Sequence, residues 1–355
     1  MANNNTKRTR RATGVIGKVL IAAAMVSLLT LTASAAELGW FRGFFEKQSD
    51  TPLTPEQVEF IDRSEQEINE SQTRDGYTLG VKSAITDGRT AHIVIGITGP
   101  ADAVLSKTVI EGYDPAAPAI LLDNWGMEGF LTDAEGRRFV GRSSIDTLED
   151  GDGLDNTQDL LLTFKPDAQA GEIPFAPGRV WKLHMENLKA IYHNEAYMNE
   201  LMEDKYKGQE NFSFTEEEGK RVNPVVTLAQ GTWDFELDFA DADVRTVELI
   251  QQPVATRSIV GWKDGQNEYG QVQIRSFALS ALGAVVTIED ETICPDFNDY
   301  ANSAFVQAVL KDGSRITLDV RSASGGTAEL EAKQPIPLDQ VDHIEMPDGV
   351  QIPMP

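Results

Sequence analysis

GYTLGVKSAITDGRTAHIVIGITGP, residues 76–100, is the stretch that decides the fold class. Apolar residues occupy alternate positions in both halves, first at Tyr77, Leu79 and Val81 and then at Ala91, Ile93, Ile95 and Ile97. A period of two places successive side chains on opposite faces of a β-strand. Asp87-Gly88 between the halves is a turn signal. The stretch therefore predicts an antiparallel β-hairpin.

The same period returns along the rest of the chain. In GTWDFELDF (residues 231–239), the alternating Trp233, Phe235, Leu237 and Phe239 are predicted to share one buried face. Further strands are predicted at residues 120–122, 138–140, 159–164, 180–188, 247–250, 271–282, 284–289, 305–310, 316–320, 341–346 and 350–352. Short strands separated by Gly, Pro and Asp turns are typical of sandwiches.

We therefore predict a mostly β protein with two tandem Ig-like β-sandwich domains, at residues 74–240 and 241–355. Tyr197, Leu201 and Met202 have helical spacing. They predict a helical insertion near residues 193–207 within the first domain.

Residues 1–36 predict export. Basic residues at 7, 8, 10 and 11 precede an uncharged apolar run from Val19 to Ala36, which orients the N-terminus inside as a cytoplasmic stub. Ala33-Ser34-Ala35 fits a signal peptidase site, whereas the length of the run approaches that of a transmembrane helix. Trp40, Phe41, Phe44 and Phe45 would suit the outer membrane interface if the helix is retained. Both readings stay open, a single-pass anchor at the cell membrane or a protein secreted after cleavage behind Ala35.

Residues 37–73 are predicted to form a helical stalk. Thr54, Pro55 and Gln57 make a capping box with proline at the first helical position. Val58, Ile61 and Ile68 would share one face of this helix, and glutamates would cover the other.

The charge and the cysteine content limit the kinds of partner and of metal site that the protein can have. The formal net charge is −25, and acids outnumber bases 56 to 31, so phosphate backbones are repelled and nucleic acid is not expected as a partner. Cys294 is the single cysteine, which excludes an intrachain disulfide and a cysteine-based zinc site. We expect Cys294 to be a small core residue.

Several of these segments resemble a known family. Residues 76–100 and 231–239 resemble an uncharacterised ectodomain family of Gram-positive bacteria, found in anti-sigma-type single-pass membrane proteins. ALSALGAVVTIED (278–290), VLKDGSRITL (309–318) and PIPLDQVDHIEMPDGVQIP (335–353) resemble the small Ig-like domain that follows it. The resemblance implies Ig-like sandwiches outside the membrane and a sigma factor nearby. Only 18 residues precede the apolar run here, which is short for a segment that holds a sigma factor.

Catalytic motifs are missing from the sequence: it has no Gly-x-Ser-x-Gly, Walker loop, His-Glu-x-x-His or Cys-x-x-Cys. The four histidines, His92, His184, His193 and His343, are far apart, and His92 falls on the polar phase of its strand, so we expect it to be exposed.

The acidic loop Asp150–Asp159 offers oxygen ligands for calcium, but its spacing departs from an EF-hand and an acidic solvated turn is the alternative. Of the tryptophans at 125, 181, 233 and 262, Trp262 is expected to be exposed and the others to lie in the core.

These observations predict a non-catalytic, membrane-anchored, extracytoplasmic binding or sensing protein. Its membrane contact would be the N-terminal helix, its ligand an unknown protein or envelope component, and any signalling to the envelope or a sigma factor would pass through a partner. No catalytic, cofactor or metal residue is predicted. The alternatives are a structural or adhesive envelope protein and an extracellular hydrolase.

Overall fold

The structure is a computed structural model, and it describes residues 39–48, 52–105, 119–123, 130–148, 156–166, 174–209, 212–239, 244–263, 266–298 and 305–355. The fold is mostly β, with several antiparallel sheets in a sandwich-like arrangement, which confirms the predicted class. Residues Gly39–Pro355 form one compact unit. The predicted export segment, residues 1–36, lies outside the described residues.

The first sheet contains the predicted hairpin. Its antiparallel order is β1-β2-β3-β7-β6, formed by β1 (Glu65–Arg74), β2 (Tyr77–Thr86), β3 (Ala91–Thr98), β7 (Thr157–Pro166) and β6 (Gly141–Thr147). Thr86 pairs with Ala91 across the turn, where Gly88 has a φ of +88° that favours glycine. The strand expected at 138–140 is wrong: β6 begins at Gly141, and Arg138 makes only an isolated bridge to Thr132.

A four-stranded sheet packs against the inner face of the first sheet. It consists of β4 (Ala119–Leu122), β5 (Leu131–Asp133), β8 (Val180–Ile191) and β9 (Val225–Asp238), with β4, β5 and β9 all paired to β8. Trp233, Phe235, Leu237 and Phe239 are buried together with Leu79, Ile93 and Leu162, which confirms the predicted buried face. The helical insertion is confirmed as α4 (Glu195–Asp204), and α5 (Glu216–Val222) follows it before β9.

The C-terminal part forms one continuous nine-stranded antiparallel sheet. Its strands are β10 (Thr246–Glu248), β11 (Val254–Lys263), β12 (Gln266–Ser280), β13 (Gly283–Ile288), β14 (Val306–Leu310), β15 (Arg315–Ser324), β16 (Thr327–Ala332), β17 (Val341–Glu345) and β18 (Gln351–Pro353), with a short 3-10 helix, η1 (Leu338–Gln340). A second hydrophobic core, containing Phe277, Val286 and Leu318, lies against this sheet. Strands β11 and β16 were not among the predicted strands.

The predicted helical stalk is wrong beyond residue 64. Helix α2 (Trp40–Gln48) is followed by α3 (Pro55–Ser64), which begins with the predicted capping box at Thr54. Residues Glu65–Arg74 form β1 and pair with β2. Ile68 therefore lies on a strand and does not share a helical face with Val58 and Ile61. An unpaired edge of β2 favours this outcome because backbone pairing satisfies its N–H and C=O groups.

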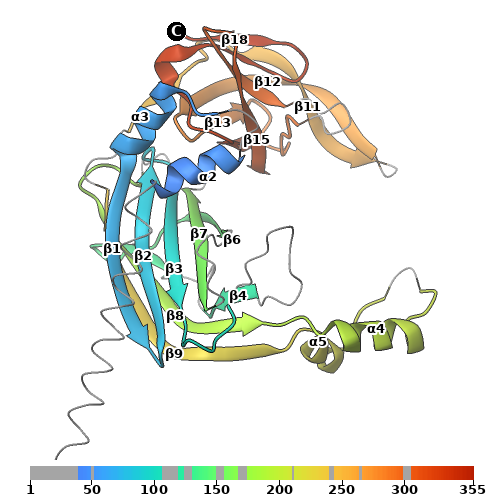
Figure 1. The fold of residues 1–355 in the computed structure, drawn as a ribbon. Helices are drawn as coiled ribbons and strands as arrows, with labels where there is room; N and C mark the ends of the chain where they lie inside the picture. The colour runs from blue at the N-terminus through green and yellow to red at the C-terminus, as the bar shows by residue number, and fades with distance from the viewer. Residues whose placement is uncertain are drawn as a thin grey trace, which may run out of the picture. The chain divides into compact units, whose positions relative to one another are not determined.

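Helices α2 and α3 and the β12–β13 turn pack on the outer face of the first sheet, where α2 lies across β2 and β3 (Figure 1). Phe41 and Phe45 are buried there with Ile85, Val94 and Leu161, and Leu282 from the β12–β13 turn joins the same cluster. The Leu282 N–H donates to Asp87 Oδ2 at 3.0 Å. The central strands are thus covered on both faces, and the membrane-interface position expected for Phe41 and Phe45 is wrong.

In the part of the chain that is described, no helix is both long and apolar enough to span a bilayer.

Candidate functional site

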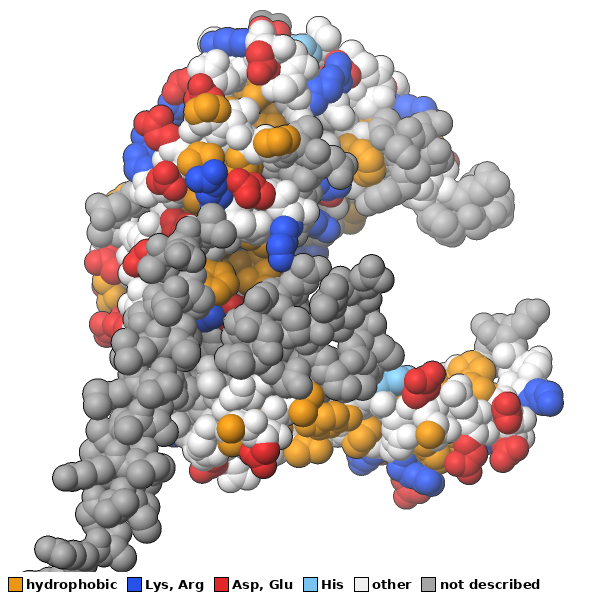
Figure 2. Space-filling view, in the orientation of Figure 1, with side chains coloured by type: hydrophobic (Ala, Val, Ile, Leu, Met, Phe, Trp, Pro, Cys, Tyr) orange, Lys and Arg blue, Asp and Glu red, His pale blue; other side chains and the backbone are white. Residues whose placement is uncertain are grey.

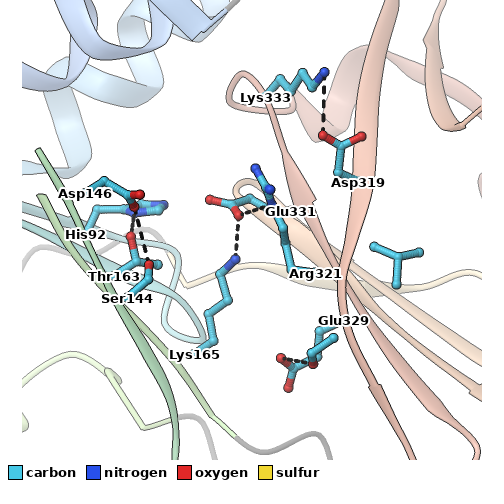
Figure 3. Close-up of polar contacts among 12 residues, drawn as sticks. His92, Ser144, Asp146, Thr163, Lys165, Asp319, Arg321, Glu329, Glu331 and Lys333 are labelled. Carbon is cyan, nitrogen blue, oxygen red and sulfur yellow. Dashed lines mark hydrogen bonds and ion pairs between the residues drawn. The ribbon is translucent and has the colours of Figure 1, made fainter. Parts of the chain in front are cut away.

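A cleft of about 560 Å³ lies between the first sheet and the C-terminal sheet. One wall is formed by β6 and β7, the other by β15 and β16, and Phe44 of α2 also lines it. Antiparallel register places Arg142 opposite Lys165 on the first wall and Ser322 opposite Glu329 on the second. The close-up shows polar side chains from both walls directed into this space (Figure 3).

An ion pair crosses the cleft at Glu331. Lys165 Nζ lies 2.7 Å from Glu331 Oε2, and Arg321 Nε donates to the same oxygen at 2.9 Å. The Lys165 and Glu331 side chains are only 15% and 20% exposed. Burial acts to raise the pKa of Glu331, but the Lys165 charge, with His92 and Arg321, outweighs it and lowers the pKa to about 2. Glu331 therefore stays ionised and links the two walls.

The remaining charges on the β15–β16 wall are held by local bonds. Ser322 Oγ donates to Glu329 Oε2 at 3.0 Å, and Glu329 is buried. Lys333 Nζ lies 3.5 Å from Asp319 Oδ2, while 43% of the Lys333 side chain is exposed. In the space-filling view, Lys and Arg side chains gather where the C-terminal sheet faces the hollow (Figure 2). The wall thus buries its carboxylates and presents cations.

His92 is buried beneath the cleft, so its expected exposure is wrong. The rings of Phe41, Phe44 and Phe45 lie 6.2–6.4 Å from its imidazole. The alternation of β3 correctly predicted that His92 lies on the face opposite Ile93 and Ile95. It could not predict that α2, from a distant part of the chain, covers that face. His92 Nδ1 is hydrogen-bonded to Thr163 Oγ1 at 2.9 Å. Burial lowers the pKa of His92 to about 4, which leaves a neutral and weakly basic imidazole at pH 7.

The other histidines lie on separate elements with partners of their own. His184 on β8 is bonded to Asp234 Oδ1 at 2.7 Å and to Glu186 Oε1 at 3.0 Å. His193 is bonded to Asn223 Oδ1, and His343 on β17 is bonded to Asp342 Oδ2. The described contacts therefore do not assemble the histidines into one site.

Most of the acidic loop proposed for calcium, residues 149–155, lies outside the described residues. Asp159, at its end, is bonded to Lys82 through both carboxylate oxygens, at 2.7 and 2.8 Å. Among the described residues, no group of three or more His, Cys, Asp or Glu side chains is arranged to hold a metal ion.

Two tryptophans are buried and the single cysteine is exposed. Trp181 and Trp233 are buried as predicted, whereas Trp125 and the Trp262 side chain lie outside the described residues. Cys294 is exposed, so its expected place in the core is wrong. It follows the β13 strand in a segment of turns and bends, where the neighbouring Pro295 and Phe297 supply the buried groups.

The charged residues of the cleft were missed by sequence reasoning. Lys165 follows a predicted strand, and Glu329, Glu331 and Lys333 alternate with Leu330 and Ala332 in a strand that was not predicted. This alternation was an available signal for β16. No signal in the sequence indicates that Lys165 and Glu331, which are 166 positions apart, meet across a cleft.

Comparisons with known proteins give one distant structural likeness. No family model matches the chain, and no curated protein matches it. The fold is similar to a solved structure described as the conserved domain protein from Bacillus anthracis, with a TM-score of 0.42 and 12% sequence identity, over 80% of this chain and 76% of that one.

Proposed function

We propose that this protein is a non-catalytic, extracytoplasmic binding or sensing protein, held at the membrane by its N-terminal segment, and that the cleft is its ligand site. The observation that carries the proposal is the cleft itself, with walls from two different sheets joined by the Lys165–Glu331 ion pair. Pockets lined by a few convergent polar groups are the usual binding sites of proteins. The basic and then apolar N-terminus supports the extracytoplasmic location.

Helix α2 supports a sensing role. Its Phe44 lines the cleft, while its Phe41 and Phe45 are buried against the first sheet. The helix begins at Trp40, four residues after the end of the predicted export segment at Ala36. A ligand that enters the cleft would therefore touch the element that joins the body to this segment. Ligand-dependent packing of α2 is a route by which occupancy could be passed to a membrane partner.

An extracellular hydrolase is the second candidate, because Thr163 lines the cleft and is hydrogen-bonded to His92. A hydroxyl beside an imidazole is the arrangement of nucleophile and base. Two observations weigh against it: the pKa of His92 is lowered to about 4, and both side chains are buried. Turnover of ester, glycan or peptide substrates that disappears in Thr163→Val would favour the hydrolase over the binding protein.

Site-specific photo-crosslinking in cells would test the binding proposal. A photoreactive amino acid at Ser144, an exposed position of the cleft wall, should form an adduct with an envelope component. The same amino acid at Arg275, an exposed position on β12, is the matched control. Equal labelling at both positions, or none at Ser144, would show that the cleft has no ligand.

N-terminal sequencing of fractionated cells would test the location. An intact N-terminus in the membrane fraction supports the anchor, and a chain that begins at Ala36 in the medium supports secretion. Recovery of the intact chain in the cytosol would contradict both.

A further inference from the structure

We infer that the cleft binds an anionic, polyhydroxylated ligand, one that carries carboxylate or phosphate groups on a sugar or polyol chain. The inference rests on the proposed function, since it names the chemical class of ligand for the same site. The polar groups of the two walls that remain accessible once the internal bonds are formed favour a ligand of this kind.

The accessible charge in the cleft is mainly positive. Arg142 is exposed on β6, and the Arg321 and Lys333 side chains are 53% and 43% exposed on the opposite wall. The carboxylates are largely withdrawn: Glu329 is buried, and Glu331 is bonded by two cations. Asp146 is the accessible carboxylate among the described lining residues. An incoming anion therefore meets three cations and one acid.

The cations are arranged as a row from one wall to the other. Arg142 lies opposite Lys165 in the β6–β7 register, Lys165 reaches Glu331, and Glu331 holds Arg321. Glu331 thus acts as an internal counter-ion that keeps the row assembled without a ligand. Guanidinium groups bind carboxylate and phosphate oxygens through paired hydrogen bonds. An oxyanion at either end of this row would have a matched donor.

Hydroxyl groups lie beside the row. Ser144 and Thr163 share the face of β6 and β7 that carries Arg142 and Lys165, and Ser322 lines the opposite wall. A hydroxyl can both donate and accept a hydrogen bond, so these groups suit a partner that is itself rich in hydroxyls. They add little for a ligand that carries only apolar groups and a single charge.

General solubility does not explain this grouping of cations. The chain has a net charge of −25, and its surface as a whole repels anions. In the cleft the cations remain accessible, while the nearby carboxylates are buried and bonded. This is the opposite of the molecule as a whole, in which acidic groups are in excess. Screening of the surrounding negative field by salt would help an anion to enter, but it would also weaken its bonds in the cleft.

The experiment titrates the whole chain in detergent, or the chain beginning at Ala36, with three defined probes. These are an oligouronate for carboxylate, a short polyol-phosphate oligomer for phosphate, and a neutral oligosaccharide of the same length. We expect one anionic probe to bind and the neutral one to bind at least about tenfold more weakly, which corresponds to one charge-assisted contact. Comparison of the two anionic probes identifies the oxyanion.

Charge variants then locate the binding. Arg142→Gln and Arg321→Gln should each weaken the anionic probe by about tenfold, and Asp146→Asn should tighten it by about two- to threefold because a like charge is removed. Arg275→Gln, an exposed arginine on β12, should leave affinity unchanged. Equal melting temperatures confirm that each variant is folded.

Two results would overturn the inference: preference for the neutral probe, or anion binding that Arg142→Gln and Arg321→Gln do not change. In each case the proposed function is tested separately by photo-crosslinking at Ser144, because that adduct does not depend on the charge of the ligand. An adduct at Ser144 without anion selectivity would keep the binding site and reject only the class of ligand.

Discussion

At the scale of single residues, the pKa values of two histidines are shifted in opposite directions, that of the buried His92 downward and that of the half-buried His184 upward. Burial beneath α2 lowers the pKa of His92 to about 4. Burial also acts to lower the pKa of His184, but its hydrogen bonds to Asp234 and Glu186 outweigh this effect and raise the pKa. The two residues should therefore give opposite contributions to stability as the pH changes.

His92→Asn tests the first contribution. The unfolded chain takes up a proton on His92 near pH 6.5 and the folded protein only near pH 4, so the wild-type protein loses up to about 3 kcal/mol between these values as the pH falls. The asparagine can keep the hydrogen bond to Thr163 but cannot titrate. Urea unfolding from pH 7 to pH 4 should give a flatter stability profile for the variant.

The exposed His193→Asn serves as the control for loss of a histidine, and its profile should parallel that of the wild type. A His92→Asn profile as steep as the wild-type one would mean that His92 is not buried in solution.

His184→Gln tests the second contribution, which has the opposite sign. A raised pKa means that the folded protein holds the proton more tightly, so the stability is present below pH 6.5 and is lost as the pH rises through the folded pKa. We expect the variant to be about 1 kcal/mol less stable at pH 6 and equal to the wild type at pH 9. Denaturant unfolding at the two pH values measures this difference, and an equal loss at both would contradict it.

At the scale of elements, helix α2 is held by burial of one face. Phe41 and Phe45 are 0% and 2% exposed, while Arg42 on the other face is exposed and pairs with Glu46 at 3.2 Å. The aromatic run after an apolar segment is compatible with a membrane interface or with a protein core. Packing decided between them, because the outer face of β2 and β3 would otherwise leave apolar side chains in water.

Phe45→Ala tests this packing. Truncation of a fully buried phenylalanine leaves a cavity, so we expect a loss of about 3–4 kcal/mol in the free energy of unfolding. The Arg42 side chain on the same helix is 45% exposed, so Arg42→Ala should change the free energy of unfolding by about 0.5 kcal/mol or less. Urea unfolding of both variants provides the comparison. If both variants changed the free energy of unfolding by the same small amount, Phe45 would not be in the core, and the membrane-interface position expected from the sequence would be favoured.

At the scale of the whole described body, a junction connects its two cores. Leu282 packs with Val94 and Leu161 of the first sheet, and its backbone N–H is bonded to Asp87. Gln57 Nε2 of α3 donates to the Pro335 carbonyl at 2.7 Å. These contacts, with the Lys165–Glu331 pair, hold the walls of the cleft at a defined separation.

Leu282→Ala should therefore destabilise both cores. We expect a loss of about 3 kcal/mol, seen by native-state hydrogen exchange in β3 of the first sheet as well as in β13 of the C-terminal sheet. Val225→Ala, at an exposed position, is the control and should affect neither. Reduced protection in β13 alone would show that the two cores unfold independently and that the junction transmits nothing between them.

The sequence by itself determined what depends on near neighbours. The hairpin of residues 77–98, the buried face of Trp233 to Phe239, the capping box at Thr54 and the helical insertion all follow from spacing and turn chemistry over a few residues. The edge strand β1 was predicted to be helical. Its glutamate-rich sequence has no strong strand pattern, so its structure is set by pairing with β2.

Only the tertiary structure decided which faces are covered and where charges meet. His92 is buried because α2, from nearly 50 positions earlier, packs over it, and the cleft exists because β6 and β7 face β15 and β16. The physical reason is that periodicity assigns a side chain to a face of its own strand, whereas burial depends on what packs against that face. That partner is chosen by the free energy of the whole fold, which no local pattern contains.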